Sequence, residues 1–261
     1  MSAPVILLHG WTMTGDVFAP LVQRLAGRCL MPDLPGHGAP GETLAEGVAL
    51  LGEVIAAEGL EGVTLVGWSM GALIGWRYLA QGGTGVARMV SLDMSPCPLP
   101  GPDWSLAMRG QSADKARRTA GRLQADWPGA ARAIAQGMFA RPEGCAAMSA
   151  AEAEARILRR DPAVMARLWS EVTGADLRAE LATIRVPLLA LHGAQSRVYP
   201  PEVADWIARA VPEGQAQVLP GCGHAPHLED PGAVADILER FRLGLAPGRC
   251  PQPRPGRGVL G

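Results

Sequence analysis

One serine lies between two glycines in the segment "LVGWSMGALIGW", residues 65–76. The apolar run before the serine is typical of a buried strand, and the run after it places apolar residues at helical spacing. A Gly-x-Ser-x-Gly motif at such a junction forms a turn so tight that its flanking residues must be small, and it lifts the serine hydroxyl above the sheet. The N–H groups that open the next helix favour negative charge there. We therefore predict that Ser69 is a nucleophile rather than a residue of an ordinary turn.

Short apolar runs alternate with helix-like segments on both sides of this motif. Strands are expected at residues 4–10, 28–38, 62–69, 87–96, 186–193 and 216–224. Helical spacing is found at residues 17–26, 43–58, 70–81, 201–211 and 230–243. Such alternation is typical of parallel βαβ units, so we predict an α/β fold with a mostly parallel sheet of about six strands.

The alternation stops after Ser95. The segment "PCPLPGPDW" is too rich in proline for a regular element, and residues 104–181 then have helical patterns with no convincing strand. We predict an α/β core over residues 1–96 and 186–245, interrupted by a helical insertion over residues 97–185. The tail, residues 246–261, is rich in Pro, Gly and Arg, a composition typical of disorder.

Composition narrows the functional classes. The chain of 261 residues has 48% hydrophobic and 19% charged residues, which is typical of a soluble globular protein. Its formal net charge of −1 gives no reason to expect a nucleic-acid partner. The first ten residues lack the basic segment of a signal peptide, and no stretch approaches the roughly 18 apolar residues of a membrane span. We therefore expect a cytoplasmic protein that is not attached to a membrane.

The cysteines are odd in number, are scattered and include no CxxC pair; they are Cys29, Cys97, Cys145, Cys222 and Cys250. This usage is typical of reduced thiols in a reducing compartment. It also argues against a metal site, and we expect no cofactor.

A general base and an oxyanion hole can be assigned from the ends of two other predicted strands. His224 in "GCGHAPHLEDP" follows the last strand, at the carboxyl edge of the sheet where Ser69 also lies. It is the predicted base, with His227 as the competitor, which we expect to open onto the pocket or the next helix. The segment "HGW", residues 9–11, follows the first strand, so the N–H groups of Trp11 and Met70 can face one oxyanion. The remaining histidines are expected to be structural: His9, His37 and His192.

With these motifs in place, the chain resembles the α/β-hydrolase fold superfamily over about residues 4–243. The segments that carry the resemblance are "HGW", "DLPGHG" (33–38), "GWSMG" (67–71), "LHG" (191–193) and "GHAPHLEDP" (223–231). Within the superfamily the chain is most similar to the pimeloyl-acyl-carrier-protein methyl ester esterases of biotin synthesis, through "LLHGW", "GWSMG", "SPC" and "HAP". The resemblance implies a serine esterase with a helical lid.

Two departures from the family pattern follow. Only Met1–Pro4 precede the "HGW" strand, where the family has two further strands, so the sheet order should be 4-3-5-6-7-8 in the family's strand names. The family's usual acid follows the penultimate strand, but "LHGAQSRVYP" places Ser196 there. A serine cannot carry the negative charge that stabilises an imidazolium. Replacing Ser196 by alanine is therefore predicted to change activity little.

Asp93 in "VSLDMSP" offers a replacement, because it ends the strand that follows the nucleophile helix. Some members of the superfamily, including a group of haloalkane dehalogenases, place their acid at that strand end. Asp93 is the predicted acid, although Asp before a Pro-rich stretch is also typical of a loop cap. The alternatives are a water-assisted dyad, another carboxylate such as Asp230, and an inactive remnant.

The insertion supplies apolar and basic side chains. Its apolar residues suit an acyl-chain pocket, and the predicted pocket residues are Trp104, Met108, Met138, Phe139 and, from outside the insertion, His227. Residues 104–141 hold seven basic side chains against two acids. These basic residues form either a solvated helix face or, as the resemblance implies, a docking surface for acyl-carrier protein; the docking residues would be Arg109, Lys115, Arg117, Arg118 and Arg122.

The sequence thus predicts a serine hydrolase that cleaves small or medium carboxylic esters with an apolar acyl part through an acyl-enzyme. A thioesterase, a lactonase or a C–C bond hydrolase would use the same groups. A non-catalytic accessory protein with this fold is the alternative from another class.

Overall fold

A computed structural model describes residues 3–245, so Met1, Ser2 and the predicted tail at 246–261 lie outside the described residues. Within that range, six strands form a single sheet in which every neighbouring pair is parallel. Their order is β2-β1-β3-β4-β5-β6, which confirms the predicted topology. The strands are β1 (Val5–Leu8), β2 (Cys29–Leu30), β3 (Val63–Trp68), β4 (Val86–Leu92), β5 (Leu188–Gly193) and β6 (Gly214–Leu219).

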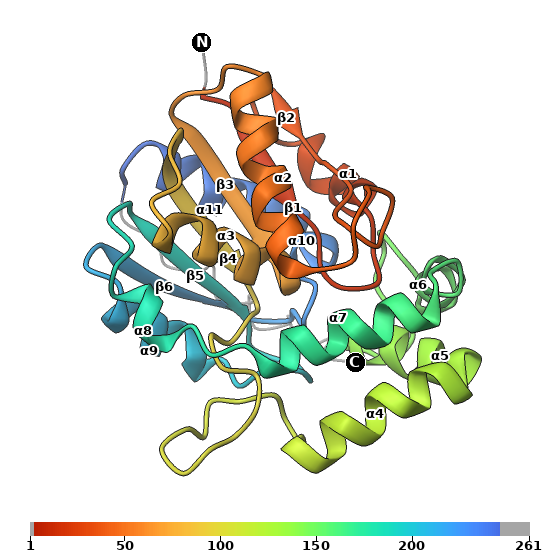
Figure 1. Cartoon of the computed structure of the whole chain (residues 1–261). Helices are drawn as coiled ribbons and strands as arrows, with labels where there is room; N and C mark the ends of the chain where they lie inside the picture. The colour runs from red at the N-terminus through yellow and green to blue at the C-terminus, as the bar shows by residue number, and fades with distance from the viewer. Residues whose placement is uncertain (1–2, 246–261) are drawn as a thin grey trace, which may run out of the picture.

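Helices cover both faces of this sheet (Figure 1). One layer contains α2 (Leu44–Ala57), α3 (Met70–Ala80), α8 (Arg178–Leu181) and α9 (Glu202–Ala210), which pack on one another in that order. The other contains η1 (Gly15–Phe18), α1 (Ala19–Val22), α10 (Pro226–Glu229) and α11 (Pro231–Arg242). Helices on both faces leave the central strands no exposed side, which explains their almost uniformly apolar sequences.

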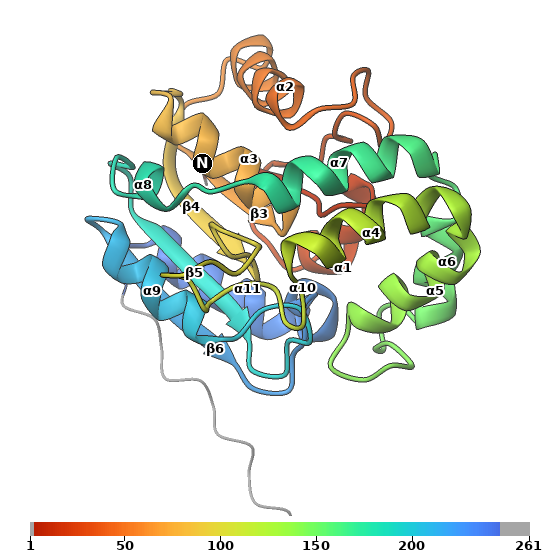
Figure 2. The same ribbon diagram turned by 60° about the horizontal axis from the view of Figure 1, so that its bottom comes forward.

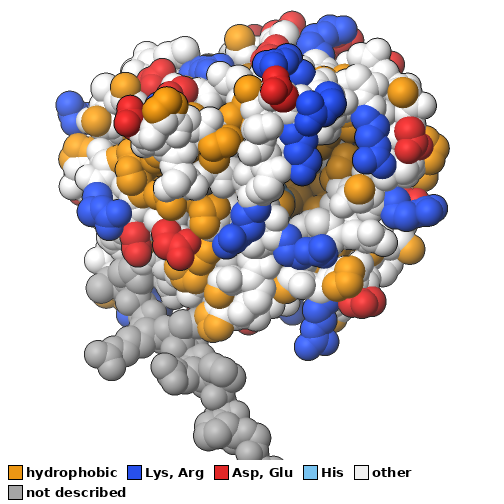
Figure 3. Space-filling view, turned by 90° about the horizontal axis from the view of Figure 1, so that it is seen from below, with side chains coloured by type: hydrophobic (Ala, Val, Ile, Leu, Met, Phe, Trp, Pro, Cys, Tyr) orange, Lys and Arg blue, Asp and Glu red, His pale blue; other side chains and the backbone are white. Residues whose placement is uncertain are grey.

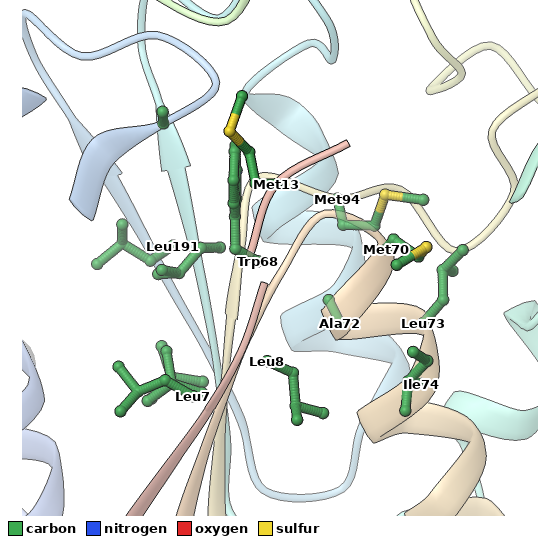
Figure 4. Close-up of a cluster of buried hydrophobic side chains, with 14 of the residues drawn as sticks. Leu7, Leu8, Met13, Trp68, Met70, Ala72, Leu73, Ile74, Met94 and Leu191 are labelled. Atoms are coloured by element: carbon green, nitrogen blue, oxygen red, sulfur yellow. The ribbon is translucent and has the colours of Figure 1, made fainter. Parts of the chain in front are cut away.

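The core lies between the sheet and these layers. Figure 4 shows Leu7 and Leu8 pointing to opposite faces of β1, as successive strand residues must. Leu8 points toward Ala72 and Ile74 of α3. These three side chains and that of Leu7 are buried. Because α3 packs directly on the central strands, its first residue, Met70, is held at the carboxyl edge of the sheet.

The segment between β4 and β5 passes beyond the carboxyl edge of the sheet, where Figure 2 shows all of its helices except α8. Among the described residues it contains α4 (Ala113–Ala125), α5 (Trp127–Gly137), α6 (Ala150–Ile157), α7 (Pro162–Gly174) and α8. Helix α4 packs along α7, and the Trp169 indole N–H of α7 donates to the Ala116 carbonyl of α4 at 3.0 Å. We call residues 97–185 the insertion.

No helix within residues 3–245 is long and apolar enough to cross a membrane.

Candidate active site

The turn between β3 and α3 holds Ser69 in a strained conformation. Its φ of 51° and ψ of −118° are unusual for a residue with a side chain. A Cβ added at Gly67 would lie 2.6 Å from the Gly71 carbonyl oxygen, and one added at Gly71 would lie 2.1 Å from the Leu8 carbonyl oxygen. Only glycine fits at these two positions, so the Gly-x-Ser-x-Gly spacing follows from the close approach of α3 to β1 and β3.

Ser69, His224 and Asp93 are brought together from three separate parts of the chain. His224 Nε2 lies 3.2 Å from Ser69 Oγ, and its Nδ1 lies 2.8 Å from Asp93 Oδ1. His224 follows β6 and is largely buried, and the Trp68 indole N–H donates to its backbone carbonyl at 2.7 Å. An imidazole held this way presents its Nδ1 proton to a carboxylate and its Nε2 to a hydroxyl, the arrangement needed to accept a proton from that hydroxyl.

Asp93 lies just past β4, is completely buried and has a φ of 44°. Besides His224, its carboxylate accepts hydrogen bonds from the Ser196 hydroxyl to Oδ1 at 2.8 Å and from the Gly193 N–H to Oδ2 at 3.0 Å. Burial alone would raise the pKa of Asp93, but the hydrogen bonds from His224 and Gly193 outweigh it and hold the pKa below its ordinary value. The carboxylate is therefore ionised at neutral pH.

Asp230, the other carboxylate considered from the sequence, is exposed and performs a different task. Its side chain accepts a hydrogen bond from the Ala233 N–H at 2.9 Å, and so caps the start of α11. Asp93 is the carboxylate that the structure brings to His224.

His227 lies three residues after His224 but in a different environment. Its ring is fully buried between Phe18 and Trp68, with centroid separations of 4.7 and 4.6 Å. Burial lowers its pKa to about 3. The fully buried His192 ring has its Nδ1 3.8 Å from Asp93 Oδ2, and burial lowers its pKa as well. Both imidazoles are neutral.

The loop after β1 is fixed by two further neutral histidines. His9 donates from Nδ1 to the Gly10 carbonyl at 2.8 Å and accepts at Nε2 from the Leu34 N–H at 2.9 Å. His37 donates to the Pro35 carbonyl and accepts from the Thr12 N–H at 3.0 Å. Burial lowers the pKa of His9 to about 4 and that of His37 to about 3, so both keep the acceptor nitrogens that these bonds require.

These bonds leave the predicted oxyanion donors free. Within residues 3–245 neither the Trp11 N–H nor the Met70 N–H donates a hydrogen bond to another group. The Met70 amide is also the first of α3, where the helix dipole favours an anion. The Trp11 indole N–H bonds to the Met165 carbonyl of α7 at 3.1 Å, which joins the loop to the insertion.

A cavity of about 380 Å³ opens above Ser69 and His224, between the sheet edge and the insertion. Its walls are mainly apolar and include Met108, Leu123, Ile134, Met138 and Trp169. The volume falls within the range of small-molecule sites. Met108 and Met138 are thus two of the predicted pocket residues that line it.

The other three predicted pocket residues do not line this cavity. The Trp104 indole N–H donates to the Cys97 carbonyl at 2.6 Å, and its ring packs on Trp206 of α9. Phe139 is fully buried in the core, and His227 lies behind Trp68. Apolar character alone did not separate residues that pack helices from residues that face the cavity.

Basic side chains surround the cavity. Figure 3 shows them in blue, viewed from the end of the molecule that carries the insertion. Among the described residues that line it, four are cationic and none is acidic; the four are Arg109, Lys115, Arg122 and Arg197. The other two predicted docking residues, Arg117 and Arg118, are exposed on α4 outside the lining. The five predicted docking residues therefore divide between the cavity and the outer face of one helix.

Several residues of the site were not predicted from the sequence, among them Tyr199, Arg197, Glu229 and Trp68. Tyr199 lines the cavity and packs on His224 with a centroid separation of 5.9 Å, and Arg197 donates to the Gln136 carbonyl at 2.9 Å. The Glu229 carboxylate accepts from the Gly223 and Ala140 N–H groups, both at 2.7 Å, and so joins the His224 loop to the insertion. Trp68 contacts His224 directly. The available signal was adjacency, since each lies one to five residues from Ser69, Ser196 or His224.

Chemically, the site can activate a hydroxyl for attack on a carbonyl and can release a leaving group by returning the proton. Within the described residues no group of three or more His, Cys, Asp or Glu side chains is arranged to hold a metal ion.

The profile of the family described as "Alpha/beta hydrolase family" matches residues 5–237. The chain belongs to this family. The hydrolase is 32% identical over 260 residues to the pimeloyl-[acyl-carrier protein] methyl ester esterase of Xanthomonas campestris pv. campestris (strain B100), which covers 92% of this chain and 95% of that one.

A second relative of the same name, from Nitrosomonas europaea, is 29% identical over 232 residues, covering 87% of this chain and 90% of that one. Among solved structures, the esterase from Exiguobacterium antarcticum superposes with a TM-score of 0.84 over 93% of this hydrolase and 92% of that chain. At 22% identity this likeness establishes the fold alone.

Proposed function

We propose that this hydrolase acts on a medium-length dicarboxylic acid that is attached at one end to acyl-carrier protein. It cleaves the methyl ester at the other end. The chain is a carboxylic ester hydrolase of the serine type, as its family, its relatives named as esterases and the Ser69–His224–Asp93 arrangement jointly support. The observation that carries the proposal is the cavity above Ser69, which combines apolar walls with a basic mouth.

The reaction begins when Ser69 Oγ attacks the ester carbonyl while His224 Nε2 accepts the hydroxyl proton. Asp93 holds the tautomer of His224 and stabilises the imidazolium that forms. The N–H groups of Trp11 and Met70 stabilise the tetrahedral oxyanion. His224 then protonates the departing methoxide. Methanol diffuses away, and the acyl group remains bound to Ser69. Water, deprotonated by His224, attacks this acyl-enzyme, and His224 returns the proton to Ser69 Oγ as the carboxylic acid is released.

Two features support a carrier-bound substrate. The cavity presents apolar walls to an acyl chain, and Met108 and Met138 can adjust to its shape. The exposed cations on and beside α4 form a positive surface around the entrance, which would attract an acidic carrier and raise its rate of encounter.

The test is hydrolysis of a methyl ester of a dicarboxylic acid attached to acyl-carrier protein, followed by mass spectrometry. Loss of the methyl group with the carrier thioester intact is the expected result. Release of a free carrier thiol instead would identify a thioesterase. Absence of a fluorophosphonate adduct on Ser69 would contradict the serine mechanism and favour a non-catalytic role.

Charge reversal tests the docking surface separately from the chemistry. Arg117→Glu with Arg118→Glu should raise KM for the carrier-bound ester about 10-fold, because like charges now face the carrier. The KM for a small soluble ester should change far less. Arg209→Glu on α9 is the matched control, since Arg209 is an exposed arginine on the core. Equal losses in all of these measurements would remove the support for docking.

A further inference from the structure

Ser196 occupies the position at which the family pattern places its acid, and its side chain contacts the Asp93 carboxylate. Ser196 is buried with 4% of its surface exposed, three residues after the end of β5 in the loop that leads to α9. Its hydroxyl lies 2.8 Å from Asp93 Oδ1, the same oxygen that faces His224 Nδ1. The His224 imidazole and the Ser196 hydroxyl, from the segments after β6 and β5, therefore converge on one carboxylate oxygen.

The direction of the Ser196 hydrogen bond follows from its other partners. Ser196 Oγ accepts from the Val198 N–H at 3.3 Å and from the Tyr199 N–H at 3.2 Å. With both donors directed at its oxygen, the single hydroxyl proton is left for Asp93, which is ionised and can only accept. A hydrogen bond to an ionised acceptor is roughly twice as strong as one between neutral groups.

The loop that carries Ser196 is itself held on both sides. The Ser196 N–H donates to the Gly193 carbonyl at 3.1 Å, and the Ser196 carbonyl accepts from Arg109 Nε at 3.2 Å. Gly193 also donates its N–H to Asp93 Oδ2. Both oxygens of the carboxylate are thus bound by the end of β5 and the loop after it.

We infer that Ser196 is a positioning residue that holds the Asp93 carboxylate so that Oδ1 faces His224. The inference rests on the proposed catalytic role of Asp93. The Ser196 hydroxyl and the Gly193 N–H each bind one oxygen of the Asp93 carboxylate, so together they fix the orientation of its plane. This replaces the prediction that Ser196→Ala changes activity little. Ser196 acts through Asp93 and does not touch the substrate.

The test compares Ser196→Ala with Ser91→Ala. Ser91 is a fully buried serine on β4, two residues before Asp93, and its hydroxyl has no hydrogen-bond partner among the described residues. We expect kcat/KM per active site, titrated with a fluorophosphonate, to fall about 10-fold or more in Ser196→Ala and to stay at the wild-type value in Ser91→Ala. Ser196→Thr should recover most of the loss because it keeps the hydroxyl.

Two readouts separate positioning from a merely structural role. Oδ1 without the serine proton is a better acceptor for the imidazolium, so the acid limb of the kcat/KM profile should move roughly a few tenths of a pH unit upward in Ser196→Ala. The low-field proton resonance of His224 Nδ1–H should shift in the same variant and return in Ser196→Thr. His192, the other imidazole near Asp93, stays neutral because burial lowers its pKa, and Glu229 is bound to backbone N–H groups.

The resonance needs no substrate, so the inference and the proposed function can fail independently. If the carrier-bound ester is not cleaved but the resonance shifts in Ser196→Ala alone, the positioning role stands and the proposed substrate is wrong. If Ser196→Ala keeps the wild-type rate and resonance, or if Ser91→Ala matches its losses, the positioning role is overturned. Should Ser196→Ala not fold, Ser196→Cys replaces it, because a thiol of similar shape is a weaker donor and should show the same shifts.

Discussion

The carboxyl edge of the sheet and the insertion above it both line the cavity. They differ in their charged side chains, which are buried at the edge and exposed on the insertion. At the edge, Asp93 is completely buried and each of its oxygens has identified donors. On the insertion, the basic residues of α4 are exposed and their ion pairs, such as Arg117 with Asp114, lie in water. A buried charge requires fixed geometry, whereas an exposed one contributes mainly to the long-range field.

This difference indicates which side chains must be placed precisely for the reaction rate. The strands fix the positions of Ser69 and Asp93 through the backbone, so small changes there should have large effects on rate. The insertion can vary its side chains with smaller effects, unless a change alters the shape of the cavity or its attachment to the core. Four predictions test this contrast, in order of decreasing effect.

The largest effect is expected for Asp93→Asn. The amide keeps the shape but cannot hold the imidazolium or the required tautomer, so kcat should fall by about 10⁴-fold. The measurement is ester turnover per fluorophosphonate-reactive site. Asp230→Asn, which keeps the cap of α11, is the control and should retain activity. Near wild-type turnover in Asp93→Asn would place the acid elsewhere.

A bulky residue in the insertion should come next. Gly137 lines the cavity at the end of α5, and a Cβ there would have no neighbour within 4 Å. Gly137→Leu should therefore project into the cavity and lower kcat/KM for a medium-length acyl ester by about 100-fold, with less effect on an acetyl ester. The control is Gly121→Leu on α4, which is equally unobstructed but outside the cavity. Equal loss for both acyl lengths would contradict this placement.

Low pH should reduce the stability of the folded core, and this effect should rank third in size. Burial lowers the pKa of His227 to about 3, whereas an exposed imidazole has a pKa near 6.5. Between these values the unfolded chain binds a proton that the folded protein does not, so stability falls as pH falls below 6.5. His227 alone should cost about 2 kcal/mol at pH 5 relative to neutral pH.

Urea unfolding at pH 7, 6 and 5 measures this loss. His227→Leu should flatten the pH dependence by about one proton, because an apolar side chain of similar size does not titrate. His9 and His37 keep their own contributions in that variant, since burial lowers their pKa values to about 4 and 3. An unchanged slope would show that His227 is already protonated in the folded protein.

The smallest effect concerns the ion pair that joins the insertion to the core. Arg156 on α6 contacts Asp16 near the start of η1 at 2.7 Å, with the aspartate largely exposed. Asp16→Asn should lower the free energy of unfolding by less than about 1 kcal/mol, and less still at high salt. Asp114→Asn breaks a pair wholly within α4 and should have almost no effect on thermal unfolding. A larger loss for Asp114→Asn would reverse the comparison.

Much of the core could be predicted because local patterns and strand order act together there. The alternation of apolar runs predicted the parallel strands, and the resemblance to the α/β-hydrolase fold predicted their order; Ser69, Asp93 and His224 each follow a strand at its carboxyl end. Parallel strands bring those ends to one edge, so residues far apart in sequence become neighbours without any knowledge of side-chain packing.

The insertion was less predictable for a physical reason. Its helices present apolar residues both to one another and to the cavity, and helical spacing does not distinguish the two surfaces. Trp104 and Phe139 therefore looked like Met108 and Met138, although only the methionines face the cavity. Likewise, His227 resembled His224 until the packing of Phe18 and Trp68 around it was known.

By itself the sequence determined the fold and the meeting of Ser69 and His224 at one edge of the sheet, because glycine spacing and strand ends impose these through the backbone. Only the tertiary structure decided how the Asp93 carboxylate is held. The hydroxyl of Ser196 and the N–H of Gly193 come from the end of the neighbouring strand, 100 or more residues from Asp93 in the chain. A buried carboxylate takes whichever donors surround it, and that choice is made by packing across the sheet rather than by any local pattern.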